Sequence, residues 1–322
     1  MNVLITGANG FIGRHLSKIL FESEHVVKGT VRSRENLVFL PEKMDVSVVD
    51  NIGPETDWRD VVKGIDVIVH LAARVHIMYE TSDSPLQQFS NVNTAGTQRL
   101  ALQAADAGVR RIIYLSTIKV NGEKTGDKPF TENDKPAPGD PYSISKWEAE
   151  QSLSRLAQKS GLEFVIVRPP LVYGAGVKGN FYNLIRLINK GLPLPLASIE
   201  NKRSLIYLGN LADAVMKCID HPYAANKTFL VSDGEDLSTP DLIRKLSAAL
   251  GKPNRLFPFP PALLRIGGTI VKRLNTVQRL TDSLTIDSAK IVNELGWTPP
   301  FTVNQGLKET AEWFKNSRLN LE

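Results

Sequence analysis

The sequence predicts a doubly wound α/β fold, in which helices cover both faces of a parallel sheet. Short apolar and β-branched runs alternate with amphipathic segments through the first half of the chain. These runs are continuously apolar, as expected for strands that are buried on both faces. A glycine-rich turn directly follows the first run. The chain has 322 residues, enough for one large domain with a smaller region attached.

The expected strands lie at residues 2–6, 25–31, 46–50, 66–72, 110–117 and 162–169. A helix over 14–22 follows the first strand. Another helix begins at Pro141, because Asp140 suits the N-cap and proline suits the first helical position. Residues 204–233 resemble a strand, a helix and a strand that return to the sheet. Elsewhere after residue 172, stretches such as GLPLPLAS indicate a smaller region of helices and loops.

Composition excludes several classes of function. The chain carries 39 Lys and Arg against 34 Asp and Glu, spread without a long basic run, so we expect no nucleic-acid partner. No stretch approaches the roughly 20 apolar residues of a membrane span. A single cysteine, Cys218, excludes an internal disulfide and a cysteine-cluster metal site. We therefore expect a cytoplasmic protein with no metal.

The segment VLITGANGFIGRHL contains three glycines, Gly7, Gly10 and Gly13, between a strand and a helix. Glycines at this spacing permit a tight turn whose backbone amides approach a pyrophosphate at the helix N-terminus. A glycine-rich turn without a ligand is the alternative, but the strand before it and the helix after it favour nucleotide binding. We expect the backbone amides of Phe11 and Ile12 to face the pyrophosphate. The Ile12 side chain is expected to pack between the helix that follows the turn and the sheet.

Two further stretches carry groups suited to proton transfer. Tyr142 and Lys146 lie four residues apart on one face of the expected helix, and a nearby ammonium favours the phenolate form of a tyrosine. Ser116 and Thr117 end a strand, at the edge where doubly wound sheets bind ligands. Alone, such a Tyr–Lys pair is usually a solvated helix face. Together, the two stretches can converge on one substrate.

In this order, the glycine turn, the strand-end hydroxyls and Tyr-x-x-x-Lys resemble the extended short-chain dehydrogenase/reductase superfamily. More narrowly, the chain is similar to its nucleotide-sugar epimerase/dehydratase group over nearly its full length. The segments VIVHLAARV, NVNTAGTQRL, VRPPLVYGAG and RSLIYLGNLADAV carry the same likeness. The resemblance implies a Rossmann-like NAD(P)-binding domain of residues 1–172 with 204–232. Residues 173–203 with 233–322 then form a smaller, interleaved C-terminal substrate-binding region.

The resemblance also implies residue roles. Tyr142 is the catalytic acid and base, Lys146 holds the nicotinamide ribose and depresses the tyrosine pKa, and Thr117 binds the reacting oxygen. The implied cofactor-binding residues are Gly7, Gly10, Phe11, Ile12, Gly13, Arg32, Asp50, Leu71, Ala72, Ala73, Asn93, Ser116, Tyr142, Lys146 and Pro169. The implied substrate-binding residues are Thr117, Asn180, Arg203 and Arg279. A homodimer formed through the Lys146 helix is typical of the family.

Several of these residues have a second interpretation. Asp50 can cap a turn, and Leu71 to Ala73 can serve close packing of helix on strand. Arg203 and Arg279 would grip the diphosphate of a UDP-sugar, although either can be an ordinary surface charge.

The stretch GTVRSRE bears on the choice of cofactor. An acid at the end of the second strand would bind the ribose hydroxyls and repel a 2′-phosphate, whereas an arginine stabilises that phosphate. Arg32 stands where the strand is expected to end, and Arg34 follows nearby. The sequence therefore favours NADP(H), with NAD(H) as the alternative.

A dissociable NADPH suits net reduction, so the leading hypothesis is a 4-ketoreductase. It would act on a UDP-4-keto-6-deoxy-N-acetylhexosamine for surface polysaccharide, as in the UDP-N-acetylquinovosamine dehydrogenase group that the chain resembles. The alternatives are a UDP-hexose or UDP-N-acetylhexosamine 4-epimerase and a non-catalytic NADP-sensing regulator. A 4,6-dehydratase is disfavoured because Ile118 and Lys119, not two acids, follow Thr117.

Simple galactose epimerisation is put in doubt by departures from the usual epimerase pattern. Pro169, Pro170 and Leu171 follow the arginine of that pattern, where an asparagine would offer a polar group to the sugar. Tyr207 and Asn210 replace its usual His and Asp.

Overall fold

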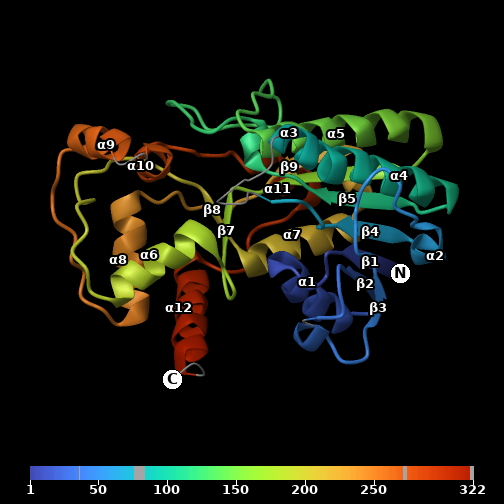
Figure 1. The fold of residues 1–322 in the computed structure, drawn as a ribbon, viewed down its shortest axis with the longest axis horizontal. Coiled ribbons are helices and arrows are strands. Elements are labelled where there is room, and N and C mark those ends of the chain that lie inside the picture. Colours follow the sequence, from blue (N-terminus) through green and yellow to red (C-terminus); the bar gives the residue numbers. More distant parts are fainter. Residues whose placement is uncertain (36, 76–83, 271–273, 320–322) are drawn as a thin grey trace.

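The computed structural model describes residues 1–35, 37–75, 84–270 and 274–319. Within them, seven strands form a parallel sheet in the order β3-β2-β1-β4-β5-β6-β9 (Figure 1). These strands are β1 (Asn2–Thr6), β2 (Val26–Val31), β3 (Asp45–Val48), β4 (Val67–His70), β5 (Arg111–Leu115), β6 (Glu163–Arg168) and β9 (Lys227–Leu230). The predicted fold class is confirmed. Since every neighbouring pair is parallel, all carboxyl ends lie at one edge of the sheet.

Helices cover both faces of this sheet (Figure 1). One face carries α1 (Phe11–Phe21), α7 (Leu208–Asp220) and α11 (Ala289–Leu295), and the other carries α2 (Arg59–Val62), α4 (Gly96–Asp106) and α5 (Pro141–Ser160). Successive strand residues feed the two layers: Ile5 packs in the cluster with α1 and α7, while Leu4 packs with α4 and α5. Before α4 the chain forms α3 (Pro85–Phe89) and a π-helical segment, Ser90–Ala95.

Single-turn 3-10 helices complete the connections of this domain, at Leu37–Phe39, Ile118–Val120 and Pro222–Ala224.

A second hydrophobic cluster lies beyond the carboxyl edge of the sheet. Its helices are α6 (Gly179–Asn189), α8 (Thr239–Leu250), α9 (Pro261–Ile270), α10 (Leu274–Thr281) and α12 (Val303–Leu319) (Figure 1). Buried Phe181, Ile185, Leu246 and Phe314 pack at its centre. The cluster is built from both stretches assigned to the substrate-binding region, an assignment that stays a prediction.

The expectation that the strand near residue 205 returns to the main sheet is wrong. This strand, β8 (Leu205–Tyr207), pairs with β7 (Leu171–Tyr173) in a separate two-stranded sheet. Pro169 and Pro170 follow β6 and lack the amide donors of a sheet ladder, so the chain leaves the sheet before β7 begins. β9 does return, beside β6, as expected.

No helix among the described residues is both long and apolar enough to cross a bilayer.

Candidate functional site

The glycine turn after β1 can admit a group close to its backbone. Gly7 has a left-handed φ of 69°, and a Cβ there would lie 3.0 Å from Ala72 Cα. A Cβ on Gly13 would lie 2.2 Å from the Gly7 oxygen. Gly10 is the N-cap of α1 and provides no side-chain cap for its first amides. Such uncapped amides at a helix N-terminus fit the phosphates of a dinucleotide.

The side chains of Phe11 and Ile12 pack against the second hydrophobic cluster, and Ile12 also contacts the cluster around α1. Only their backbone amides are therefore available for a phosphate.

The turn after β4 is fixed against the glycine turn and against α5. The Thr6 hydroxyl accepts a hydrogen bond from the Ala72 amide at 3.2 Å. Buried Asn93, in the π-helical segment, accepts from the Arg74 amide at 2.8 Å and donates to the Arg74 carbonyl at 3.0 Å. Its amide nitrogen also donates to Ser145 Oγ at 2.9 Å. Asn93 thus positions the stretch that contains Leu71, Ala72 and Ala73, and its direct cofactor contact stays a prediction.

Arg32 and Asp50 lie at adjoining strand ends. Arg32 directly follows β2, Asp50 comes two residues after β3, and both are exposed. The Asp50 carboxylate accepts a hydrogen bond from the Asn51 amide at 2.8 Å, which agrees with the turn-capping interpretation. Arg32 is placed as the 2′-phosphate hypothesis requires.

The N-terminus of α5 forms as predicted and sets the positions of Tyr142 and Lys146. Asp140 accepts from the Ser143 amide at 2.7 Å, and Ser143 Oγ accepts from the Asp140 amide at 3.1 Å, forming a reciprocal cap. Tyr142 lies in the first turn and remains partly exposed. Lys146 lies one turn further and is buried, with Nζ 3.9 Å from the Tyr114 ring centre.

Burial shifts the pKa values of both Tyr142 and Lys146. Burial lowers the pKa of Lys146 to about 7, and Glu150 opposes that shift. Burial raises the pKa of Tyr142 to about 12, and the Asp140 charge adds to it. Burial thus disfavours the charged forms of both side chains, and the role of Lys146 in depressing the tyrosine pKa stays a prediction.

His70 and Lys146 both contact the Tyr114 ring, and His70 was not predicted. Its Nδ1 is 2.6 Å from Thr6 Oγ1, its Nε2 is 3.0 Å from Thr97 Oγ1, and its ring stacks on Tyr114 at 5.7 Å. Burial lowers its pKa to about 3, and Lys146 acts in the same direction. His70 is therefore neutral near neutral pH. The only sequence signal was its place at the end of an apolar strand.

This neutral histidine predicts a loss of stability in acid. Because the pKa of His70 is about 3 in the fold and 6.5 in its reference state, the unfolded chain binds the proton first as pH falls through this range. We expect wild type to lose about 2 kcal/mol more unfolding free energy than His70→Gln between about pH 7 and about pH 5. Urea titrations at the two pH values measure this difference. Equal losses in the two proteins would contradict it.

The strand-end hydroxyls have different surroundings. Ser116 Oγ donates to Glu150, whose carboxylate accepts from Arg168 Nε at 3.0 Å, and both charged residues are buried. Arg168 also donates to Asn121 at 2.9 Å. The Ser116 hydroxyl is thus committed to a buried network. Thr117 is partly exposed at the carboxyl edge, the more suitable position for meeting a substrate.

Sequence reasoning missed Glu150 as part of this site. The available signal was its spacing, since Glu150 follows Lys146 by four residues on the face that already carries Tyr142.

Pro169 lies next to the segment that carries Thr117. It is buried directly after β6, and its carbonyl accepts from the Ile118 amide at 2.9 Å. This bond fixes the backbone just after Thr117.

The two predicted substrate arginines lie near enough for the charge of Arg279 to act on Arg203. Half-buried Arg203, before β8, donates to the Asp282 carbonyl at 3.0 Å. Burial lowers its pKa, the Asp282 charge opposes the shift, and nearby Arg279 of α10 lowers it further. An anion lying between two guanidinium groups would relieve their repulsion. Asn180 is exposed in the first turn of α6.

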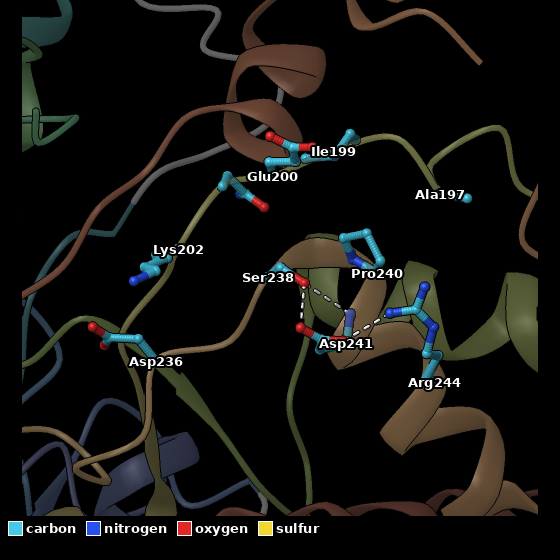
Figure 2. Close-up of a pocket in the computed structure, with 10 residues that line it drawn as sticks. Ala197, Ile199, Glu200, Lys202, Asp236, Ser238, Pro240, Asp241 and Arg244 are labelled. Atoms are coloured by element: carbon cyan, nitrogen blue, oxygen red, sulfur yellow. Dashed lines mark hydrogen bonds and ion pairs between the residues drawn. The ribbon is translucent and has the colours of Figure 1, made fainter. Parts of the chain in front are cut away.

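A pocket lies beside this region, between residues 197–202 and the N-terminus of α8 (Figure 2). Ser238 caps α8 by accepting from the Asp241 amide at 3.1 Å, and Arg244 donates to Asp241 at 2.7 Å. Acidic and basic side chains alternate around the pocket, so it presents no uniform charge to a diphosphate. The arginine pair therefore stays the predicted anion site.

The acid absent from position 210 is supplied from elsewhere in the chain. Asp233 accepts from Asn210 Nδ2 at 2.7 Å, from the Tyr207 amide at 2.8 Å and from the Tyr173 hydroxyl at 2.7 Å. Burial raises its pKa, and these three donors oppose the rise. Its carboxylate therefore joins β7, β8 and α7.

Comparisons with known proteins agree with this geometry. A family model described as the NAD dependent epimerase/dehydratase family matches residues 3–232. The chain is 45% identical over 320 residues to a Vibrio cholerae protein named UDP-glucose 4-epimerase, covering 97% of this chain and 95% of the relative. It is 26% identical to an Escherichia coli O157:H7 protein named N-acetyl-alpha-D-glucosaminyl-diphospho-ditrans,octacis-undecaprenol 4-epimerase, with coverage of 97% and 95%.

Among solved structures, the fold matches the UDP-glucuronic acid 4-epimerase of Bacillus cereus in complex with NAD. The TM-score is 0.79 at 22% identity, covering 98% of this chain and 99% of that one. The Thermotoga maritima UDP-glucose 4-epimerase gives a TM-score of 0.77 at 22% identity, with coverage of 99% and 100%. Together with the family match over most of its length, these findings establish that the chain is an enzyme of the NAD dependent epimerase/dehydratase family.

Proposed function

We propose that this enzyme is a 4-epimerase of a UDP-hexose or UDP-N-acetylhexosamine. The observation that carries the proposal is the 45% identity, along nearly the whole chain, to a protein named UDP-glucose 4-epimerase. Tyr142, Lys146 and Thr117 supply the groups that such a reaction needs. The relative acting on an undecaprenol-linked sugar supports a role in glycan assembly. The epimerase thus replaces the ketoreductase as the leading hypothesis.

The chain's own residues would control the proton and the orientation of the sugar. A bound nicotinamide would supply the hydride transfer to and from C4. Tyr142 Oη would take the C4 hydroxyl proton as that carbon is oxidised to a ketone, and would return it as the ketone is reduced from the opposite face. Thr117 Oγ1 would donate a hydrogen bond to the same oxygen. Lys146 would hold the ribose hydroxyls of the cofactor.

The diphosphate of the substrate would lie between Arg203 and Arg279. Their mutual repulsion and the partial burial of Arg203 favour a doubly charged anion there. The reacting sugar would then point from the arginine pair toward Tyr142. In this arrangement the second hydrophobic cluster is the substrate-binding region, and α4 and α5 remain available for the homodimer that the family resemblance implies.

The 4-ketoreductase is the second candidate, and exposed Arg32 at the end of β2 favours it. An NADP(H) preference would suit a cofactor that leaves after each net reduction. Leu171 is also exposed where the usual epimerase pattern has a polar asparagine.

One set of incubations separates the candidates. Purified enzyme is incubated with UDP-glucose or UDP-N-acetylglucosamine, and separately with UDP-4-keto-6-deoxy-N-acetylglucosamine plus NADPH or NADH. The epimerase proposal expects a UDP-hexose to be converted to its 4-epimer without net consumption of cofactor. Oxidation of NAD(P)H with the keto sugar, with both UDP-hexoses unchanged, would establish the reductase instead. Cofactor binding without any turnover would favour the regulator and overturn both.

A charge reversal tests the cofactor preference. Arg32→Asp is expected to raise the ratio of the NADPH to the NADH dissociation constant by about tenfold or more. The substitution replaces a guanidinium that would donate hydrogen bonds to the 2′-phosphate with a carboxylate that repels it. Equilibrium binding to the purified variant measures the ratio. Arg34→Asp is the matched control and should leave it unchanged. An unaltered ratio in Arg32→Asp would make Arg32 a solvated surface charge.

A further inference from the structure

Lys119 lies at the junction of the two segments that carry Thr117 and Tyr142. It belongs to the single-turn 3-10 helix Ile118–Val120, which directly follows Thr117. Its side chain reaches Asp140, the N-cap of α5, two residues before Tyr142. One lysine therefore connects the turn that bears the Thr117 hydroxyl to the start of the helix that bears the Tyr142 phenol.

The backbone amide of Lys119 sets the direction of the Thr117 hydroxyl. This amide donates a hydrogen bond to Thr117 Oγ1 at 3.3 Å. A hydroxyl has one hydrogen to donate and two lone pairs that accept, and the amide occupies one of these lone pairs. Among the described residues the hydroxyl makes no further hydrogen bond, so its hydrogen is available to a substrate oxygen.

The ammonium of Lys119 holds the residue that caps α5. Its Nζ donates to Asp140 Oδ2 and, at 3.0 Å, to Glu123 Oε1. The Lys119 and Asp140 side chains are 27% and 24% exposed, so this pair is largely shielded from water. Glu123 is 54% exposed, and an ion pair so open to solvent contributes little. The contact with Asp140 is therefore the stronger of the two.

A backbone contact supports the same junction. The Ala137 amide donates to the Val120 carbonyl at 2.9 Å, which holds the stretch before α5 against the 3-10 helix. The Asp140 carboxylate also accepts from the Ser143 amide, and so fixes the first turn of α5. The position of Tyr142 relative to Thr117 is thus set at a point where Lys119 supplies the positive charge.

The charge of Asp140 also acts on Tyr142. Burial is the larger cause of the raised pKa of Tyr142, and the Asp140 carboxylate adds to it. Burial acts to raise the pKa of Asp140 as well, but the hydrogen bonds from Lys119 and from the Ser143 amide hold it below its usual value. Asp140 is therefore negatively charged at neutral pH, and Lys119 is its counter-charge.

The other ionisable groups around Tyr142 come from different elements. Lys146 follows it by one turn on α5, and Tyr114 of β5 is close enough for its pKa to be raised by the Tyr142 charge. Arg74, in the stretch after β4, lies over the Phe89 ring that meets Tyr142 edge-on. A substitution in the 3-10 helix leaves all three ionisable groups in place.

We propose that Lys119 is a positioning residue for the reaction. Its ammonium holds and neutralises the Asp140 carboxylate, and thereby keeps the Tyr142 phenol in place to meet the same sugar oxygen as the Thr117 hydroxyl. Without that ammonium, the uncompensated carboxylate would disfavour the phenolate form of Tyr142. This inference rests on the proposed function, because it takes Tyr142 to be the proton acceptor at C4.

The test compares the pH dependence of turnover in Lys119→Met, Lys119→Arg and Lys124→Met. Lys119→Met should move the rise of kcat/KM to higher pH by about one unit, because the phenolate forms less readily. Below the plateau, turnover is then about tenfold slower than in wild type. Lys119→Arg keeps the charge and a hydrogen-bond donor, and should retain the wild-type profile. Lys124 is an exposed lysine close by in the chain, so Lys124→Met should do the same.

A second substitution separates the charge of the cap from its hydrogen bonds. Asn is about as good an N-cap as Asp, so Asp140→Asn keeps the start of α5 while removing the carboxylate. In Lys119→Met/Asp140→Asn the rise of kcat/KM should return toward the wild-type pH. An equal loss of rate at every pH, or a shift that Asp140→Asn does not reverse, would make Lys119 a purely structural residue and overturn the proposal.

The ionisation of Tyr142 is also measured without turnover. Phenolate absorbance is titrated in each variant, with and without added NAD, and the titration of the same variant carrying Tyr142→Phe is subtracted. Lys119→Met should ionise at higher pH than wild type, and an unchanged value would overturn the proposal whatever reaction the enzyme performs. If only the keto sugar reacts, the proposed function alone fails. The loss of reductase activity at high pH should then move upward by a similar amount in Lys119→Met.

Discussion

The Tyr142→Phe variant is expected to lose turnover by roughly 10²–10⁴-fold while it still binds the nicotinamide cofactor. The phenol hydroxyl is the proposed proton acceptor and donor at C4, and Phe keeps the ring that meets Phe89 edge-on at 6.1 Å. Epimer formation in single-substrate assays measures turnover, and calorimetric titration measures cofactor binding.

Tyr182→Phe is the matched control for this substitution. Tyr182 packs against Trp313 and Phe314 in the second hydrophobic cluster, away from α5, so its variant should turn over within about twofold of wild type. Near-normal turnover by Tyr142→Phe would remove Tyr142 from the mechanism and leave the family assignment intact.

Glu150→Ala is expected to lower the free energy of unfolding by about 3–5 kcal/mol. The substitution leaves the buried Arg168 guanidinium without its counter-charge and the Ser116 hydroxyl without its acceptor. Urea unfolding monitored by circular dichroism measures the loss.

The control for Glu150 is Glu123, an exposed glutamate whose ion-pair partner is a lysine. Glu123 accepts from Lys119 at 3.0 Å but is 54% exposed, so Glu123→Ala should cost about 0.5 kcal/mol or less. If Glu150→Ala were as mild as Glu123→Ala, the Glu150–Arg168 pair would not be a major source of stability.

The elements that the sequence predicts well are those encoded by neighbouring residues. The glycine turn between β1 and α1 follows from three glycines and their flanking patterns, and the start of α5 follows from Asp140 and Pro141. Parallel strands then bring their carboxyl ends to one edge whatever the details of the loops. This is why Arg32, Thr117 and Tyr142 lie along that edge as expected.

Contacts between distant residues could not be derived in this way. The buried Glu150–Arg168 pair and the neutral His70 depend on which side chains the fold encloses, and burial sets their chemistry. Asp233 shows the same limit. An acid expected at position 210 is absent there, yet a carboxylate 23 residues later lies within hydrogen-bond distance of Asn210. The sequence pattern indicates that the acid at position 210 is missing, whereas in the folded molecule the Asp233 carboxylate lies beside that position.

The three hydrogen bonds of the Asn93 side chain also have a consequence for the order in which parts of the enzyme open. They tie the backbone at Arg74, beside the expected cofactor site, to Ser145 in the helix that carries Tyr142 and Lys146. A local opening in which the Asn93 side chain leaves Arg74 would also disturb its contact to α5. Hydrogen exchange at Arg74 should therefore keep pace with exchange in the first turns of α5, so that this loop and the catalytic helix behave as a single cooperative unit.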